Sequence, residues 1–206
     1  MSSGRHAAVI LAAGLSSRMQ QFKPLLPLGG ETITDHIIST FLNCGIEVFL
    51  IVGHRQDELR AAIKKHDITI IENPDYRQGM FTSIQAGIRR LEPAYQAFFI
   101  MPVDIPLVRE STIRRLLDTG AEQPDKIVYP VFGKKRGHPP LIPSSFVFPI
   151  LFWQGGGGLK AFLKSQEEMA LDLPVADSNI LFDIDTPDDY ELLLEQFHRN
   201  EIPTDE

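Results

Sequence analysis

The feature that most restricts the fold is the alternation of short apolar runs with segments of helical spacing. Each run is bounded by turn-forming residues and is too short for a buried helix, which is typical of a strand covered on both faces. The expected strands are Ala8–Leu11, Glu47–Gly53, Ile68–Ile71 and Gln96–Met101, and the expected helices between them are Thr32–Asn43, Gln56–Lys65 and Met80–Leu91. Strands that alternate with helices favour right-handed βαβ crossovers. We therefore expect an α/β fold of three layers, α/β/α, with a mainly parallel central sheet.

The second half of the chain is less regular. We expect helices at Ser111–Thr119, Leu159–Ser165 and Pro187–Phe197, strands at Lys126–Phe132, Ala170–Val175 and Ile180–Asp185, and a short edge strand at Pro140–Pro143. Consecutive glycines at Gly155–Gly158 interrupt this half, and glycine loses more conformational freedom on folding than any other residue. We therefore expect a mobile loop there, at least without ligand.

The length of the chain fits one domain, because 206 residues are enough to bury a substantial core. We expect a single domain over residues 1–206, with its core at about residues 7–198 and a frayed polar tail at 199–206. No apolar run approaches the ~20 residues of a membrane span, and the first residues lack the apolar core of a signal peptide. These features indicate a cytoplasmic protein with no membrane partner.

The formal net charge of the chain is −7, which disfavours nucleic acid as a partner. A polyphosphate ligand would then have to be held by local cations and a metal ion, against the overall field. The single cysteine, Cys44, excludes an internal disulfide and a cysteine-based zinc site, and its position indicates a core residue or a helix end.

A turn of small residues follows the first expected strand. Ala12, Ala13 and Gly14 come first, and Ser16 and Ser17 are turn-forming or helix-capping residues. Small side chains let backbone N–H groups approach a ligand, and a turn rich in free N–H groups can hold an anion.

Two cations follow this turn. Arg18 carries a planar guanidinium matched to phosphate oxygens, and Lys23 carries a mobile point charge next to the backbone restriction of Pro24. From the residues alone, a phosphate-binding loop and an ordinary turn with two surface cations remain equally open.

The stretch Leu11–Met19, LAAGLSSRM, followed by Phe22–Leu26, FKPLL, resembles the LAAGxSxRM…K signature of nucleotidyltransferases with a GT-A-like Rossmann fold. Within them it is most similar to the MobA-like NTP transferase family, which contains molybdenum cofactor cytidylyltransferases and guanylyltransferases. The resemblance implies a Rossmann-like, GT-A-type fold and catalytic roles for Arg18 and Lys23. The implied nucleotide-binding residues of the loop are Leu11, Ala12, Ala13, Gly14, Ser16, Ser17, Arg18 and Lys23.

Asp104 follows the fourth expected strand, at the edge where α/β sheets place their ligands. A carboxylate near the two cations suits Mg²⁺, which takes oxygen ligands; a helix-cap or turn aspartate is the alternative. The segment Met101–Val108 resembles the family's metal-binding segment xGDMPxV, although Pro102 and Val103 replace the usual pair before the aspartate. The resemblance implies that Asp104 is catalytic and holds Mg²⁺, with Mn²⁺ as an alternative metal.

Asp183 and Asp185 alternate on the last expected strand, so both should point to one face of the sheet. Two like charges side by side are costly unless a cation lies between them or water reaches them. The segment Phe182–Tyr190, FDIDTPDDY, resembles the family's xDIDTPEDL segment, which implies that one of the two aspartates is a second metal ligand. We favour Asp183 as that ligand and a structural role at the helix start for Asp185.

The segment Asn73–Gly87 resembles the family's N-P-x-x-x-x-G-M-x-x-S segment, which contacts the base and ribose. This likeness places Gly79, Met80 and Ser83 near the nucleotide. Gly79 permits close backbone approach, and the Ser83 hydroxyl can both donate and accept a hydrogen bond. A turn glycine and an ordinary helical serine are the alternatives.

The segment Arg136–Pro140, RGHPP, resembles the RGHP segment of the cytidylyltransferase branch, which implies that His138 and Pro139 lie near the acceptor. A turn histidine is the alternative. The glycine run and Lys160 stand where the family has GDxGxR, with glycine in place of the aspartate and lysine in place of the arginine. We assign Gly156 and Lys160 to the acceptor site, and this departure leaves the identity of the acceptor open.

The resemblance implies transfer of a nucleoside monophosphate from an NTP to a phosphorylated acceptor, with release of pyrophosphate. Ala13 makes the loop LAAG, as in the cytidylyltransferase branch, whereas the guanylyltransferase branch resembles LAGG. Together with the RGHP segment this favours CTP and a molybdopterin acceptor. A molybdoenzyme or a chaperone is then a candidate transient partner.

Other classes of function are weighed against this one. Sugar-phosphate nucleotidyltransferases that use UTP can also carry LAAG. A nicotinamide oxidoreductase would need an acidic residue after the second strand, where Gly53-His54-Arg55 offers none. A non-catalytic nucleotide sensor would keep the loop and lose the carboxylates, whereas this chain has its aspartates at all three positions.

Overall fold

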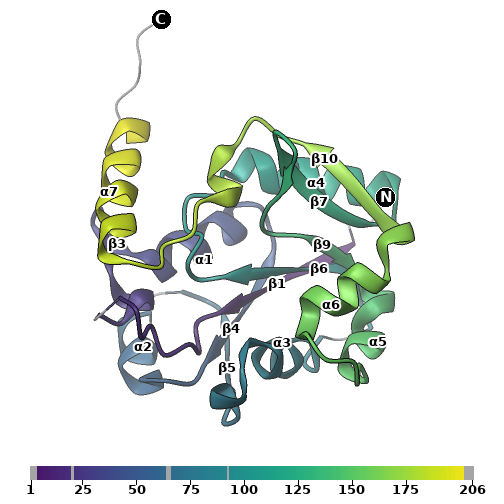
Figure 1. Cartoon of the computed structure of the whole chain (residues 1–206), viewed down its shortest axis with the longest axis horizontal. Helices are drawn as coiled ribbons and strands as arrows, with labels where there is room; N and C mark the ends of the chain where they lie inside the picture. Colours follow the sequence, from purple (N-terminus) through teal and green to yellow (C-terminus); the bar gives the residue numbers. More distant parts are fainter. Residues whose placement is uncertain (1–3, 20, 64–65, 92, 202–206) are drawn as a thin grey trace, which may run out of the picture.

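The computed structural model describes residues 4–19, 21–63, 66–91 and 93–201. Its central sheet has the strand order β10-β7-β9-β6-β1-β4-β5, with β8 paired to β7. The strands are β1 (Arg5–Leu11), β4 (Glu47–Val52), β5 (Thr69–Glu72), β6 (Tyr95–Pro102), β7 (Ile127–Phe132), β8 (Lys135–Arg136), β9 (Leu141–Pro143) and β10 (Ala170–Pro174). The run β6-β1-β4-β5 and the pair β10-β7 are parallel, whereas β8 and β9 are antiparallel to their neighbours. The expected mainly parallel sheet is confirmed (Figure 1).

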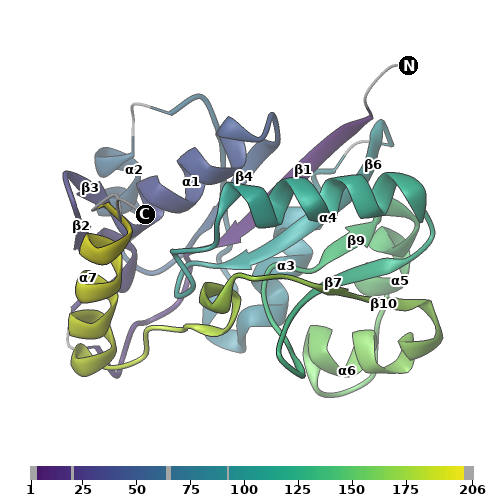
Figure 2. The same cartoon turned by 90° about the horizontal axis from the view of Figure 1, so that it is seen from above.

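Helices cover both faces of the sheet. The helices are α1 (Ile33–Asn43), α2 (Gln56–Ala62), α4 (Glu110–Glu122) and α7 (Pro187–Glu201), which pack in one apolar cluster, and α3 (Met80–Ile88), α5 (Val147–Leu151) and α6 (Gly158–Ser165), which pack in the other. Figures 1 and 2 both show α1 and α4 on one side of the sheet and α3, α5 and α6 on the other. In β1, Ala8 and Ile10 belong to the first cluster and Val9 and Leu11 to the second, as a strand covered on both faces requires. The expected three-layer α/β/α architecture is confirmed.

The carboxyl ends of β1 and its neighbours lie at the same edge of the sheet. Leu11, the last residue of β1, is paired with Pro102 of β6 and with Ile51 of β4. The chain that follows β1 and the chain that follows β6 therefore leave the sheet side by side. This register brings the loop of small residues next to Asp104.

A strand is present at the expected segment Pro140–Pro143, but its expected position at the edge of the sheet is wrong. The strand β9 lies inside the sheet, where it pairs antiparallel with both β6 and β7. Leu141 and Ile142 are 1% and 0% exposed, so this short apolar segment fills the middle of the sheet. A strand this short shows no periodicity that distinguishes an internal position from an edge.

The expected strand at Ile180–Asp185 is also wrong. Residues Ser178–Leu181 form a 3-10 helix, and the next four residues pair with no strand. The segment is instead attached at two points, because Ile180 accepts from the His138 N–H and the Ile184 N–H donates to the Asp104 carbonyl, both at 2.9 Å. We call residues 178–186 the crossing segment, because they connect β10 to α7 past these two loops.

The ends of several helices differ from the expected ones. The helix α2 ends at Ala62, and Lys64 and Lys65, which were included in the expected helix, lie outside the described residues. The helix α1 begins after its N-cap Thr32 and ends at its C-cap Cys44, which confirms the helix-end position of the cysteine. No helix in the described part of the chain is long and apolar enough to cross a membrane.

The last helix is longer than expected. It continues to Glu201, past the expected end at Phe197, and residues 202–206 lie outside the described ranges. The fraying of the tail stays a prediction. Arg199 bonds the Glu195 carbonyl and lies 3.8 Å from its carboxylate, a contact one helical turn long. In the glycine run, α6 begins at Gly158, and the mobility of that loop stays a prediction.

Candidate active site

The loop after β1 is held against β4. The Ala12 N–H donates to the Ile51 carbonyl at 2.9 Å, and the His54 N–H donates to the Ala13 carbonyl at 3.3 Å. A Cβ on Gly14 would meet no atom within 4 Å. The loop is therefore fixed at its base and open at Gly14, as the approach of a ligand requires.

Ser16 turns the loop back toward Lys23. Its φ of 51° lies in the left-handed region that non-glycine residues seldom adopt. The Ser16 carbonyl accepts from the Met19 N–H at 3.1 Å, and its Oγ accepts from the Lys23 N–H at 3.2 Å. Ser17 and Arg18 lie in the turn that these bonds close.

Four of the predicted site residues, one of which is Lys23, form a connected cluster of charges. The Lys23 ammonium lies 3.2 Å from Asp185 Oδ1 and 3.7 Å from Asp104 Oδ2. Asp185 Oδ2 lies 2.8 Å from Arg18 Nη1, and the Arg18 side chain remains 71% exposed. The structure thus brings together two cations of the loop, the aspartate after β6 and an aspartate of the crossing segment.

The environment of Asp104 opposes its ionisation. Burial raises the pKa of Asp104, and the carboxylates of Asp185 and Asp183 raise it further, while the Lys23 ammonium lowers it. A cation bound beside Asp104 would relieve this repulsion. The negative charge of Asp104, Asp183 and Asp185 therefore exceeds the positive charge of Lys23 and Arg18.

Asp183 and Asp185 differ in their surroundings. Asp185 is partly buried and is bonded by Lys23 and Arg18, whereas Asp183 is exposed. The argument that both point to one face of a strand is wrong, because these residues form no strand. Asp189 accepts from the Asp185 and Thr186 N–H groups at 3.0 and 2.7 Å, so Asp189 caps the start of α7.

The donor set fits a magnesium ion that completes its coordination with substrate. In the described ranges, no three or more His, Cys, Asp or Glu side chains are grouped as a ready-made metal site. Mg²⁺ is typically held by one or two carboxylates plus substrate phosphates and waters. Asp104 and Asp185, which contact the same ammonium, provide two carboxylates of that kind.

The predicted nucleotide-binding residues after β5 separate into two groups. Gly79 has a φ of 114°, which favours glycine, and Met80 is 58% exposed; both line the cavity described below. Ser83 is only 4% exposed and accepts from Asn73 Nδ2 at 2.9 Å. Asn73 also bonds Thr82 and the Asp75 N–H, so Asn73 and Ser83 fix the loop that presents Gly79.

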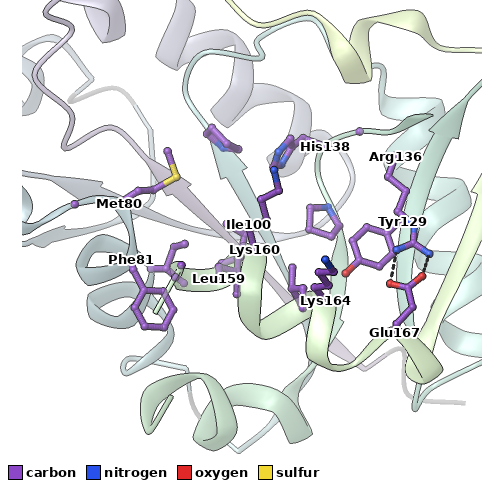
Figure 3. Close-up of a pocket in the computed structure, with 18 of the residues that line it drawn as sticks. Met80, Phe81, Ile100, Tyr129, Arg136, His138, Leu159, Lys160, Lys164 and Glu167 are labelled. Atoms are coloured by element: carbon purple, nitrogen blue, oxygen red, sulfur yellow. Dashed lines mark hydrogen bonds and ion pairs between the residues drawn. The ribbon is translucent and has the colours of Figure 1, made fainter. Parts of the chain in front are cut away.

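A cavity of about 830 Å³ extends from this loop to α6 (Figure 3). Its wall includes Pro102 at the end of β6, Tyr129 of β7 and Lys160 of α6. Of the predicted acceptor residues, His138 and Lys160 line it. Pro139 and Gly156 do not, and their neighbours Pro140 and Gly157 take those places.

His138 is held as a neutral ring in this wall. Burial lowers the pKa of His138, although the carboxylates of Asp104 and Asp183 oppose the shift. Its Nδ1 is buried without a hydrogen-bond partner. A neutral imidazole can donate or accept toward a ligand at neutral pH.

The residues of the cavity wall to which the sequence analysis gave no role include Arg136, Tyr129 and Glu167. Arg136 bonds both carboxylate oxygens of Glu167, at 2.9 and 2.7 Å, and its Cζ lies 4.5 Å from the centre of the Tyr129 ring. Burial raises the pKa of Tyr129 to about 12. Arg136 and Glu167 are 31 positions apart in the chain, so no local pattern could have paired them.

The profile of the MobA-like NTP transferase domain matches residues 8–170. The chain belongs to the MobA-like NTP transferase family. It is also 31% identical over 183 residues to the molybdenum cofactor cytidylyltransferase of Escherichia coli (strain K12), an alignment that covers 88% of this chain and 92% of that protein. The resemblance drawn from the loop signature is thus confirmed across most of the chain.

Solved structures show the same MobA-like fold. Rv0371c from Mycobacterium tuberculosis H37Rv superimposes with a TM-score of 0.83 at 26% identity, covering 94% of this chain and 100% of that one. A structure of Rv0371c in complex with manganese gives a TM-score of 0.76 at 25% identity, with the same coverage. A divalent metal is therefore known in a relative of this transferase.

A shorter likeness covers just over half of the chain. The bifunctional protein GlmU of Solibacter usitatus is 33% identical over 120 residues, which cover 56% of this chain and 26% of that protein. This match spans a minor part of GlmU.

Proposed function

We propose that this MobA-like NTP transferase is a Mg²⁺-dependent cytidylyltransferase. It transfers cytidine monophosphate from CTP to a phosphorylated acceptor, molybdopterin, and releases pyrophosphate. The observation that carries the proposal is the meeting of Arg18, Lys23, Asp104 and Asp185 at the end of β1 and β6. Two cations beside two carboxylates suit a phosphate chain and a divalent metal.

The reaction needs positioning and charge stabilisation more than acid–base chemistry. An oxygen of the acceptor phosphate forms a bond to the α-phosphorus of CTP, and the bond from that phosphorus to the bridging oxygen breaks, so pyrophosphate leaves with the electron pair. The attacking phosphate is already ionised at neutral pH and needs no general base. In-line geometry and preorganised charge then supply the rate enhancement.

Each part of the site has a role in this scheme. Arg18 and the N–H groups of residues 13–17 bind the β- and γ-phosphates, and Lys23 stabilises the charge that grows on the α-phosphate. Asp104 and Asp185 would hold Mg²⁺, or Mn²⁺ in its place, which supplies Lewis-acid charge neutralisation when bound. The contact of Asp185 with Lys23 supports Asp185 over the exposed Asp183 as the second metal ligand.

Gly79 and Met80 line the cavity, which suits a role beside the base and ribose. The choice of CTP and molybdopterin is supported by the LAAG loop, by the RGHP segment and by the similarity to the Escherichia coli cytidylyltransferase. A sugar-phosphate nucleotidyltransferase is the second candidate, because the LAAG loop also occurs in sugar-phosphate nucleotidyltransferases that use UTP.

The test is pyrophosphate release from each of the four NTPs with Mg²⁺, in the presence and absence of molybdopterin. We expect release only with CTP and molybdopterin together. Release with UTP and a sugar phosphate would transfer the assignment to the second candidate. NTP binding of equal affinity with and without Mg²⁺, together with no turnover, would identify a nucleotide sensor instead.

A further inference from the structure

The described wall of the cavity contains Arg136, His138 and two lysines, and neither lysine forms an ion pair with a described residue. Arg136 is bonded to Glu167 and Asp172, and burial keeps His138 neutral. Lys160 and Lys164 form no ion pair with any residue inside the described ranges. They are therefore the cationic groups that the cavity can offer to a ligand.

Lys160 and Lys164 stand on the same face of α6. They are one helical turn apart, and side chains at that spacing are neighbours. Figure 3 shows Lys160 extending from α6 toward His138 and Lys164 lying beside Tyr129. Like charges at this helical spacing are destabilising, and an anion bound in the cavity would offset that repulsion.

The rest of the cavity wall is largely apolar. Phe81, Ile84 and Ile100 come from α3 and β6, and Leu159 and Leu163 come from the same helix as the lysines. Glu167 is the acidic residue of the described lining, and Arg136 neutralises it. An anion with an apolar body can thus enter the cavity without meeting an unpaired carboxylate.

We propose that Lys160 and Lys164 make this cavity selective for an acceptor that carries a second anionic group in addition to its reacting phosphate. The inference depends on the proposed function, because the reacting phosphate is the one that lies by Asp104. His138 and Pro102 form the part of the cavity wall nearest that cluster, and Lys164 lies beside Tyr129. An acceptor with one phosphate and a neutral polar body leaves the lysine pair unpaired and binds more weakly.

Pyridoxal 5′-phosphate tests the lysine pair without any assumption about the reaction. Its aldehyde forms an imine with one amine, with loss of water, while its phosphate pairs with the neighbouring ammonium; borohydride reduces the imine and peptide mapping locates it. We expect labelling of Lys160 and Lys164 to be on the order of tenfold faster than labelling of Lys134, as a hydrogen bond between charged groups allows. Pyridoxal without the phosphate should lose this preference.

Single variants then show whether the two lysines act together. Lys160→Met should slow labelling of Lys164 by on the order of tenfold and leave Lys134 unchanged, because the phosphate loses its partner. Lys134 is the control, since it lies exposed in the turn between β7 and β8. Equal labelling rates at Lys160, Lys164 and Lys134, or a Lys164 rate unaffected by Lys160→Met, would overturn the proposal.

Steady-state kinetics test whether the two lysines contribute to binding of the acceptor. With CTP, Mg²⁺ and molybdopterin, Lys164→Met should raise the KM for molybdopterin on the order of tenfold and leave the KM for CTP unchanged, whereas Lys134→Met should change neither. An unchanged KM for molybdopterin would contradict the selectivity. If the wild-type protein does not turn over molybdopterin, the proposed acceptor is wrong, and the labelling experiment alone decides whether the lysine pair binds a second anion.

Discussion

Lys23 joins carboxylates that come from distant parts of the chain. Asp104 follows β6, Asp185 precedes α7, and both lie within 3.7 Å of the Lys23 ammonium, whose residue is 8% exposed. In the proposed mechanism the phosphates of CTP compete with these carboxylates for Lys23 and Arg18. Nucleotide binding therefore requires that another cation take over the carboxylates.

Replacement of Lys23 tests this exchange of partners. Lys23→Ala should lower the turnover number by on the order of 10²- to 10³-fold, because charge on the α-phosphate is no longer stabilised. The fold should be retained, as judged by circular dichroism. Lys134→Ala is the matched control and should keep wild-type turnover. A Lys23→Ala enzyme with a near wild-type rate would remove Lys23 from the mechanism.

Replacement of Asp104 tests the metal site. Asp104→Asn should lower turnover by on the order of 10²- to 10³-fold at saturating CTP and should weaken the dependence of CTP binding on Mg²⁺. Titration calorimetry with and without Mg²⁺ measures the second effect. Asp118→Asn, on the exposed face of α4, should behave as the wild type. Unchanged Mg²⁺ dependence in Asp104→Asn would show that Asp104 does not hold the metal.

His138 gives the molecule a sensitivity to acid. Because burial lowers its pKa, the unfolded chain binds a proton more readily than the native state, and stability is lost as the pH falls through the ordinary value of 6.5 and below. His138→Gln should therefore show a shallower fall in the free energy of unfolding between about pH 7 and pH 5. Urea denaturation at several pH values measures it, with His198→Gln as control. A slope equal to that of the wild type would refute this account.

At the scale of elements, α7 holds the crossing segment in place. Tyr190 Oη donates to the Pro27 carbonyl in the hairpin β2 (Pro27–Leu28) and β3 (Glu31–Thr32), and Leu193 is fully buried in the sheet-facing core. The hairpin follows Lys23 in the chain, and α7 follows Asp185. The packing of α7 therefore sets the distance between the Lys23 ammonium and the Asp185 carboxylate.

Two neighbouring leucines of α7 test this packing. Leu193→Ala should lower the free energy of unfolding by about 2–5 kcal/mol, because it leaves a cavity in the core. Leu192 is 48% exposed, and Leu192→Ala should change that free energy by less than about 0.5 kcal/mol. Urea unfolding compares the two variants. Equal losses in both would mean that α7 is not anchored through Leu193.

The elements that the sequence predicted correctly are long enough to show a continuous apolar run or a helical period. The strands β1, β4 and β6 are apolar runs buried on both faces, and β5 is a shorter run at the end of the sheet. The helices between them carry apolar residues at helical spacing. Leu141–Pro143 and Ser178–Leu181 are too short to show either pattern. Their positions are set by contacts with residues distant in the chain, such as the hydrogen bond that the Ile184 N–H donates to the Asp104 carbonyl.

At the scale of the whole molecule, the site was predictable where a strand end leads into a motif. Arg18, Lys23 and Asp104 follow β1 and β6, so the parallel register brings them together, as expected. Asp185 instead reaches the cluster through a segment without regular structure. The bond of Arg136 to Glu167 depends on how β8 packs against the turn after α6, which no sequence pattern encodes.

The whole account depends on transfer of the nucleoside monophosphate, and the fate of labelled phosphates tests that step most directly. CTP radiolabelled at either the α- or the γ-phosphate is incubated with the protein, Mg²⁺ and molybdopterin, and the products are separated. The account predicts that the α-label moves to the acceptor and the γ-label to pyrophosphate, in equal amounts. A γ-label recovered as inorganic phosphate or on the acceptor would mean hydrolysis or phosphoryl transfer, and would contradict it.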